Sequence, residues 1–402
     1  MNRLELTGLT ARPSQVWGGV RLVPLVREEP VAGLRLHREV YERLGAGVVE
    51  LGSRTHYVSY LPHGLVADWS GEGAGARDGG GQSAAYGTQL GGQEAPRTVR
   101  LPRLVHHRMA KRRPGDRLRF LPLHLALEGY LALHFGGPST AWEEWSRQAL
   151  RAGLSPRAED AYLGWSVRGL EDALRVFEIH PGQCGVMVYV SDALAAAFVV
   201  PHPEDYRLLH ASLVEDLFGE LVHQYGLYGA PVAEFGARIR GEEHIRTLAG
   251  LRAAARGQER AWAEAHDGLF ARELLNTSYG FERVYRMGSF TLWRFLPPFV
   301  RDGSGQHIGE TITGHKGQVA YLKTFRLSDA QVRRGHLLHT LAGAEWELSR
   351  AAGVLGTSRE ELVRRIRAAG FSRLLKGNVQ TGAQSGERAE SNVGREPTRR
   401  PF

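Results

Sequence analysis

Candidate nucleophiles are scarce in this chain. Cys184 is the only thiol among its 402 residues. A catalytic cysteine needs a neighbouring base and a positive environment that lower its pKa, and no histidine lies beside it in the sequence. Because Cys184 leads into a run of β-forming residues, Val186 to Val190, we interpret it as a small core residue. Neither a Gly-x-Ser-x-Gly nor a His-Glu-x-x-His motif occurs.

A metal site would have to draw on the 17 histidines. The tightest mixed cluster is His307, Glu310 and His315, with Gly309 and Gly314 between them. Such spacing predicts a loop or hairpin rather than a helix that would align ligands. We therefore expect neither a metal nor another cofactor, and no constellation in the sequence identifies an enzyme.

The net charge of +8 is concentrated in two segments. Residues 103–119 hold seven Lys and Arg against one Asp, and residues 328–402 hold 13 against eight Asp and Glu. The remainder of the chain is therefore slightly acidic. This distribution argues against a uniformly basic nucleic-acid binder and for two separate contacts with anions.

The first basic segment, residues 103–119, turns at Pro114 and Gly115. One interpretation is a phosphate-binding loop for nucleic acid or for a nucleotide or ADP-ribose-like ligand. The other is a solvated loop, or a partner for acidic side chains elsewhere. The candidate phosphate-binding residues are His106, His107, Arg108, Lys111, Arg112 and Arg113.

The second basic segment has the spacing of two short helices. Ala351 and Ala352 lie in the first, which runs into Gly356, a residue that adopts a left-handed conformation without steric cost. Ser358 then caps the second helix, with Glu361 three places on as in a capping box.

The second helix has an apolar stripe and basic faces. Leu362 and Ile366, four residues apart, predict the buried stripe. Residues 348–371, with their Ala-Ala pair, turn glycine, capped start and spaced Leu and Ile, resemble the C-terminal helix-turn-helix of Fis-type bacterial regulators. The resemblance implies that the second helix enters the DNA major groove from a homodimer. The DNA-binding residues that it implies are Ser358, Arg359, Arg364, Arg365 and Arg367.

The resemblance departs at Glu360 and Glu361, which place two acids early in that helix. Carboxylates there repel phosphate and can read only a cytosine amino group. The alternative is a structural helical hairpin that packs on the protein's own core.

The elements before the tail predict a mixed body. Val20 to Val26 reads as a strand that Pro24 makes an edge or breaks. Residues 47–51 and 56–61 predict a strand pair, and residues 279–325 alternate as strands do. Further expected elements are strands at 186–190 and 195–200, helices near 204–225 and 241–275, a flexible glycine-rich insertion at 71–94 and a disordered tail at 377–402.

Two motifs in this body carry a second resemblance. The turn Gly-Gln-Cys-Gly-Val at 182–186 and the run Val-Trp-Gly-Gly-Val-Arg-Leu-Val-Pro-Leu at 16–25 are similar to ARG-and-rhodanese-phosphatase-superfamily-associated (ARPP-type) domains of bacteria, over residues 10–230. That family name records neighbouring genes and implies an ADP-ribose-related or stress system rather than a known reaction. The chain lacks a Glu-x-Gly-Arg-Trp cluster of part of that grouping, which indicates a divergent branch.

The sequence thus predicts an α+β protein, a mixed α/β body followed by a small three-helix domain. We expect the body at 1–235, its completion at 236–326, the helix-turn-helix at 327–376 and the tail beyond. A single cysteine, no apparent signal peptide and no long apolar run predict a cytoplasmic protein without a membrane partner.

The expected function is a DNA-binding regulator whose body senses a ligand or partner. The alternative is an enzyme or accessory protein of ADP-ribose or phosphoester metabolism with a purely structural tail.

Overall fold

The computed structural model describes residues 2–36, 48–52, 55–58, 67–68, 179–213, 225–226, 228–234, 239, 242–300, 303, 305–372 and 374–375. The insertion at 71–94, the basic segment at 103–119 and the tail at 377–402 lie outside them. The chain divides into two compact units, and the described part of the second begins at Arg334, within a helix. Each unit is described by itself.

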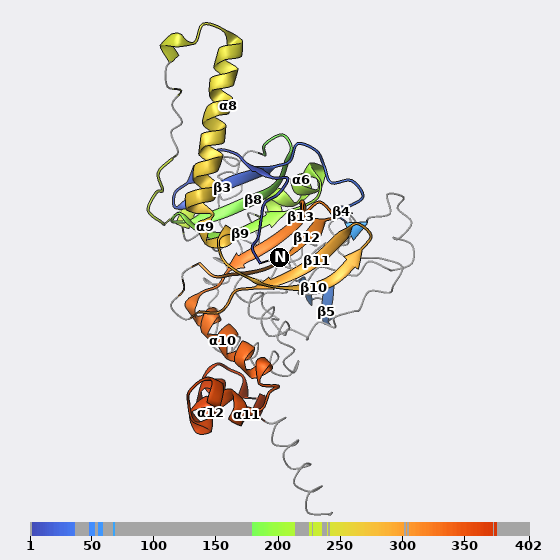
Figure 1. Ribbon diagram of the computed structural model, residues 1–402, viewed down its shortest axis with the longest axis vertical. Helices are drawn as coiled ribbons and strands as arrows, with labels where there is room; N and C mark the ends of the chain where they lie inside the picture. Colours follow the sequence, from blue (N-terminus) through green and yellow to red (C-terminus); the bar gives the residue numbers. More distant parts are fainter. Residues whose placement is uncertain are drawn as a thin grey trace, which may run out of the picture. The chain divides into compact units, whose positions relative to one another are not determined.

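An antiparallel sheet forms the centre of the first unit (Figure 1). Within the described residues it has nine strands, with β2 (Gln15–Trp17) paired to β3 beside the main path. The main path runs through β1 (Thr10–Ala11), β3 (Val20–Val26), β8 (Gln183–Val190), β9 (Ala193–Val199), β13 (Val319–Arg326), β12 (His307–Gly314), β11 (Phe290–Leu296) and β10 (Gly280–Met287). The strands predicted at 20–26, 186–190, 195–200 and within 279–325 are thereby confirmed.

Pro24 neither breaks β3 nor makes it an edge strand, so that expectation is wrong. β3 pairs with β8 along its whole length and with β1 and β2 on its other side. The Pro24 carbonyl accepts from the Arg12 amide at 2.9 Å, between β1 and β2. Because a strand residue's N and C=O point to the same side, the missing N–H also faces that stretch, where no ladder bond is lost.

Two small strand pairs and a helix belong to the same unit. Strands β4 (Arg35–Leu36) and β7 (Ala67–Asp68) pair with each other, as do β5 (Val48–Gly52) and β6 (Thr55–Val58). The latter confirms the predicted pair at 47–51 and 56–61. Helix α6 (Pro203–Ser212) follows β9 and contacts β8.

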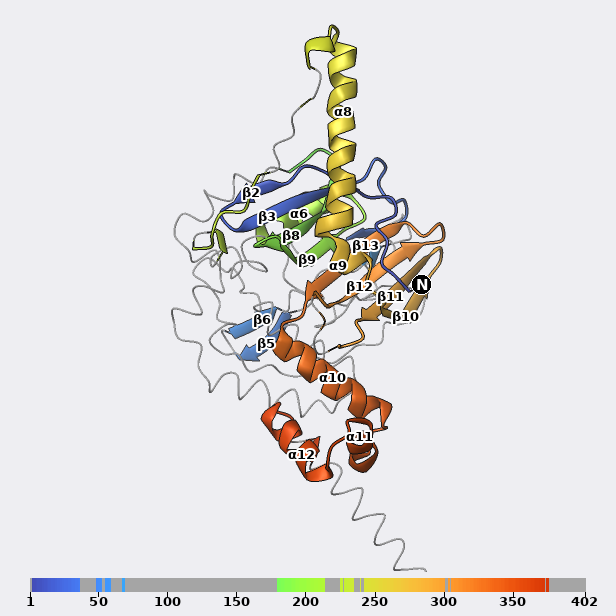
Figure 2. The same ribbon diagram turned by 60° about the vertical axis from the view of Figure 1, so that its left-hand side comes forward.

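A helical segment packs against one face of the sheet through its C-terminal part, from Trp262 onward. It comprises a short turn η5 (Glu242–His244), helix α8 (Leu248–Ala265), a π-helical turn η6 (His266–Phe270) and α9 (Arg272–Leu275). Helix α8 extends away from the sheet in both views (Figures 1 and 2), and its early residues Leu248 and Leu251 are exposed. None of the described helices is both long and apolar enough to cross a membrane.

The core of the first unit joins this segment to the sheet. Buried side chains from the central strands, including Val23, Met187 and Leu322, cluster with Trp262 and Leu274 from the helical segment. Strands β3 and β12 are buried at every position, and β8 and β13 at all but the last. Strands that are covered on both faces leave no solvated side for polar groups.

A row of alternating charges crosses four strands on the other face. Glu282, Arg294, Glu310 and Lys323 are successive cross-strand partners. Lys323 Nζ lies 3.2 Å from a Glu310 carboxylate oxygen, and both side chains are buried. Burial lowers the pKa of Lys323, while the Glu310 carboxylate partly offsets this. Opposite charges directly across from each other stabilise the pairing of strands.

The described part of the second unit is helical. Helix α10 (Asp329–Gly343) runs into it from the first unit, followed by α11 (Leu348–Val354) and α12 (Arg359–Ala368), which contact each other. The Ser358 hydroxyl accepts from the Glu361 amide at 3.2 Å, so the predicted cap is confirmed. Gly356 has φ +57°, which gives the predicted left-handed turn before that cap.

Candidate functional site

The hairpin between β8 and β9 aims an acidic side chain at the sheet. Its two loop residues, Ser191 and Asp192, have φ +48° and +61°, as a tight turn between twisted strands requires. Arg21 on β3 lies across from Tyr189 on β8, two residues before the loop. Its Nε donates to the Asp192 carboxylate at 2.9 Å.

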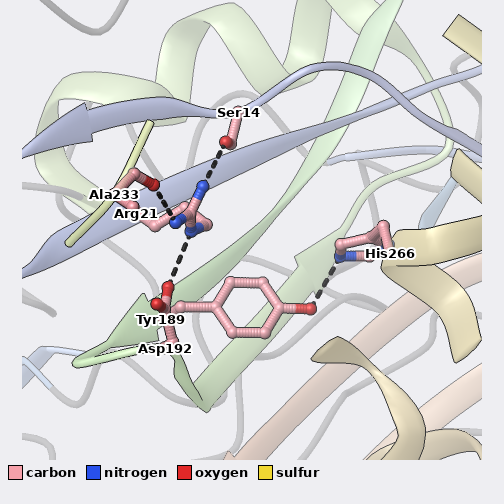
Figure 3. Close-up of polar contacts among 6 residues, drawn as sticks. All are labelled: Ser14, Arg21, Tyr189, Asp192, Ala233 and His266. Carbon is pink, nitrogen blue, oxygen red and sulfur yellow. Dashed lines mark hydrogen bonds and ion pairs between the residues drawn. The ribbon is translucent and has the colours of Figure 1, made fainter. Parts of the chain in front are cut away.

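Arg21 is almost fully buried and is held by three groups (Figure 3). Besides Asp192, it donates to the Ser14 hydroxyl at 2.8 Å and to the Ala233 carbonyl at 2.6 Å. Its guanidinium carbon also lies 5.2 Å from the centre of the Phe270 ring. These contacts, which we call the Arg21 cluster, tie together the N-terminal strands, the β8–β9 hairpin and the helical segment.

The π-helical turn places three aromatic rings in a column. His266 stacks on Trp262 with ring centres 5.1 Å apart and on Phe270 at 6.4 Å. A π-turn inside a helical segment is rare and frequently marks a functional site. Here it directs His266 into the protein, where the residue is 1% exposed.

A hydrogen-bonded chain joins His266 to both the core and the surface. The Asp267 carboxylate lies 2.8 Å from His266 Nδ1, and the Tyr189 hydroxyl lies 2.7 Å from Nε2. A carboxylate can only accept, so we assign a proton to Nδ1; with Nε2 as the acceptor, the Tyr189 hydroxyl is the donor. Figure 3 shows Tyr189 reaching His266 from the strand.

Tyr189 is the buried end of this chain. Burial raises the pKa of its hydroxyl far above the ordinary value, the Asp267 charge adds to that rise, and Arg21 opposes it. The phenol therefore stays neutral, and its side chain is fully buried. It positions η6, and with it the residues that follow on α9.

A pocket of about 690 Å³ opens beside this arrangement. Phe270 forms part of its wall. Arg272 and Arg326 line it and make no ion pair with any residue that the structure describes. The pocket therefore offers two guanidinium groups that suit the oxygens of an anion. Its polar lining consists of Ser191, Asp192, Arg272, Glu273, Asn276, Thr277 and Arg326.

Comparison of the sequence with protein-family models assigns the chain to a family. The ARPP-2 family model matches residues 4–288. The chain belongs to the ARPP-2 family. The expected ARPP-type domain is thus confirmed, over a longer span than residues 10–230. No curated protein and no solved structure matches the chain.

The ARPP-2 region, residues 4–288, contains the Arg21 cluster and the Tyr189–His266 contact. Arg326 and helices α10 to α12 lie beyond it. None of Arg21, Tyr189 and His266 was a sequence candidate. The available signals were an arginine within the apolar run of residues 20–26, and the four-residue spacing of Trp262, His266 and Phe270.

The candidate cluster of His307, Glu310 and His315 is not assembled. His307 and Glu310 lie on strand β12, which forms a hairpin with β13 as one of the two predicted alternatives had it. They are three residues apart on the strand, so their side chains point to opposite faces. Glu310 pairs with Lys323. No group of three potential ligands is close enough to hold a metal ion in the described part of the chain.

The remaining sequence candidates fall into three groups. Cys184 is a fully buried residue of β8, as predicted, and burial raises its pKa although Arg27 opposes this. The five DNA-binding candidates lie at α12, with Ser358 as its cap. The phosphate-binding candidates His106, His107, Arg108, Lys111, Arg112 and Arg113 lie outside the described residues.

The Tyr189–His266 contact can be tested by removing one hydroxyl. Tyr189→Phe should lower the free energy of unfolding by about 1–3 kcal/mol, because it leaves a buried imidazole nitrogen unpaired. Amide hydrogen exchange should accelerate at residues 266–270. The control is Tyr228→Phe, at a tyrosine that is 77% exposed. Equal stability and unchanged exchange in both variants would show that the hydrogen bond does not hold η6.

His307 provides a test by pH. It is fully buried, its Nε2 has no hydrogen-bond partner in the described structure, and burial together with Arg326 lowers its pKa to about 3. Between that value and the ordinary pKa of about 6.5, the unfolded chain binds more protons than the folded protein. The free energy of unfolding should therefore fall by about 1.4 kcal/mol for each unit that the pH falls through this window.

Urea unfolding of wild type, His307→Gln and the exposed control His244→Gln, at several pH values in this window, measures that slope. His307→Gln should flatten it and His244→Gln should not. A slope that survives in His307→Gln would assign the pH dependence to other groups.

Proposed function

We propose that the protein is a DNA-binding regulator in which α12 contacts DNA and the ARPP-2 region senses a ligand or partner. The observation that carries this proposal is the capped, basic helix α12. It follows α11 across a left-handed glycine turn. A helix-turn-helix uses such a second helix for the major groove.

The two sides of α12 support this assignment. Leu362 and Ile366 are fully buried, whereas Arg359, Arg364 and Arg367 are exposed. The basic residues are therefore available to phosphate oxygens or guanine edges while the apolar stripe holds the helix in place.

The acids in the first turn of α12 determine which of its arginines are available for phosphate. Glu361 pairs with Arg364 and with Arg365, the latter at 3.0 Å, so its charge is met within the helix. Arg359 and Arg367 make no ion pair within the described residues. We assign the principal phosphate contacts to them. Glu360 stays ionised, since backbone and Ser358 hydrogen bonds lower its pKa, and limits affinity for phosphate.

The test is fluorescence anisotropy of the full chain on duplex DNA over a range of salt concentrations. Replacing both Arg359 and Arg367 by Ala should weaken binding and reduce the salt slope by about 2, about 1 for each lost contact. The matched control replaces Arg252 and Arg256, two exposed arginines on α8, by Ala. The same change of net charge there should leave the slope unchanged.

Two outcomes contradict this proposal. One is wild-type protein without salt-dependent binding even near about 50 mM salt. The other is an equal loss in the α8 control, which would reduce the effect to net charge. Since a Fis-like helix acts from a dimer, sedimentation of the DNA-bound species should show two copies of the chain.

A second function is favoured by the pocket beside η6. Arg272 and Arg326 line it without carboxylate partners in the described structure. Such a pair suits a phosphoester, which supports the alternative of an enzyme or accessory protein of ADP-ribose metabolism with a structural tail.

Thermal unfolding with added ADP-ribose, NAD or inorganic phosphate tests this second function. A ligand of the folded state at about 100 times its Kd should stabilise it by about 2.7 kcal/mol. Replacing Arg272 and Arg326 by Ala should abolish that gain, and Arg286→Ala, outside the pocket, should not. No stabilisation by any of the three compounds would exclude this use of the pocket, whatever the tail does on DNA.

A further inference from the structure

Arg27 differs from Arg12 and Arg21, the two arginines that precede it near the N-terminal strands. Arg12 pairs with Glu259, and Arg21 pairs with Asp192. Arg27 directly follows β3 and is only 7% exposed. It donates to the Val319 carbonyl at 2.6 Å, but it makes no ion pair with a described carboxylate, and its Nε has no hydrogen-bond partner there.

A buried charge without a counter-charge is costly, so this guanidinium calls for an anion. The Cys184 thiol, with which Arg27 interacts in the core, does not serve as the counter-charge. Burial keeps the pKa of Cys184 above its ordinary value despite Arg27, so the thiol is neutral. No group among the described residues therefore supplies the counter-charge.

Arg27 lines a pocket of about 660 Å³ beside the end of β3 and the turns that follow β10 and β12. Gly8, with φ +83°, lies beside it, and a side chain there would begin 3.6 Å from Arg27 Nη1. The glycine leaves that side of the guanidinium open to the pocket. Leu9, Val31 and Phe290 supply apolar wall.

The same pocket carries groups of the opposite character. Gln318 lines it, and its buried Oε1 has no hydrogen-bond partner within the described structure. The exposed residues Glu28 and Glu29 line its rim. These oxygens attract a cation and oppose a doubly charged phosphate.

We infer that this pocket binds a free α-amino acid with an apolar side chain. Its carboxylate would lie on Arg27, in the planar two-point geometry that a guanidinium offers. Its ammonium group would face Gln318, Glu28 and Glu29, and its side chain would contact the apolar wall. This site is separate from α12 and from the pocket at Arg272 and Arg326.

The experiment uses the full chain. Thermal unfolding is followed with each common α-amino acid in turn, with acetate and with inorganic phosphate, and calorimetry then gives Kd for the best ligand. The best ligand should be an apolar amino acid, bound more tightly than acetate or phosphate. Arg27→Gln, checked for folding by circular dichroism, should abolish this binding.

Glu28 and Glu29 are exposed, so they can be replaced without disturbing the core. Replacing Glu28 and Glu29 together by Gln should raise Kd for the amino acid about tenfold, equivalent to about 1.4 kcal/mol. The same variant should leave acetate bound as before or more tightly. The control is Glu234→Gln, an exposed carboxylate outside the pocket.

Three results would overturn the inference. The first is phosphate binding more tightly than any amino acid. The second is acetate binding as well as the best amino acid, with both indifferent to the rim acids. The third is no stabilisation by any amino acid at concentrations up to about 10 mM, which corresponds to a binding free energy weaker than about −3 kcal/mol.

Discussion

Burial of the central strands on both faces is the constraint on which the rest of this protein depends. Strands β3, β8, β12 and β13 are covered almost throughout. Any polar side chain on them must find a partner inside or remain neutral. Arg21 finds three partners, Lys323 finds Glu310, and His307 remains neutral. Apolar packing supplies most of the stability of such a sheet, and these few polar groups decide which segments can lie against it.

The same constraint explains how the ARPP-2 region is held around its pockets. The Arg21 cluster fixes the β8–β9 hairpin, and Tyr189 fixes η6 through His266. Asp192 of the hairpin and Phe270 of η6 both line the pocket beside Arg272 and Arg326, so buried hydrogen bonds hold two of its walls. Arg27 is the exception, since its pairing is incomplete within the described chain. A fully partnered arginine acts as structure, whereas an incompletely partnered one beside a cavity is suited to binding.

Much of the sheet could be predicted from the sequence, because buried strands require apolar runs such as residues 20–26 and 186–190. Helix α12 was equally readable, since caps and turn glycines act over three or four residues. The candidate site was not, because its contacts are long-range. Arg21 and Asp192 are 171 residues apart, and Tyr189 and His266 are 77 apart. Local periodicity carries no information on such pairs. The expectation that Pro24 breaks β3 or makes it an edge strand was wrong for a related reason. The cost of its missing N–H depends on whether a neighbouring strand would have accepted a hydrogen bond from it, which the sequence does not show.

The π-turn at His266–Phe270 makes the protein sensitive to chain length at one point. Each residue of an α-helix advances the chain by about 100° around the axis. Deleting one residue from this turn would let α8 continue as a regular helix and would rotate everything after it by about that angle. Arg272 and Leu274 would then each turn by about 100°, the one away from the pocket and the other away from the core. Most single substitutions in this turn would keep the directions of the side chains that follow it. Deletion of a single residue would change all of them.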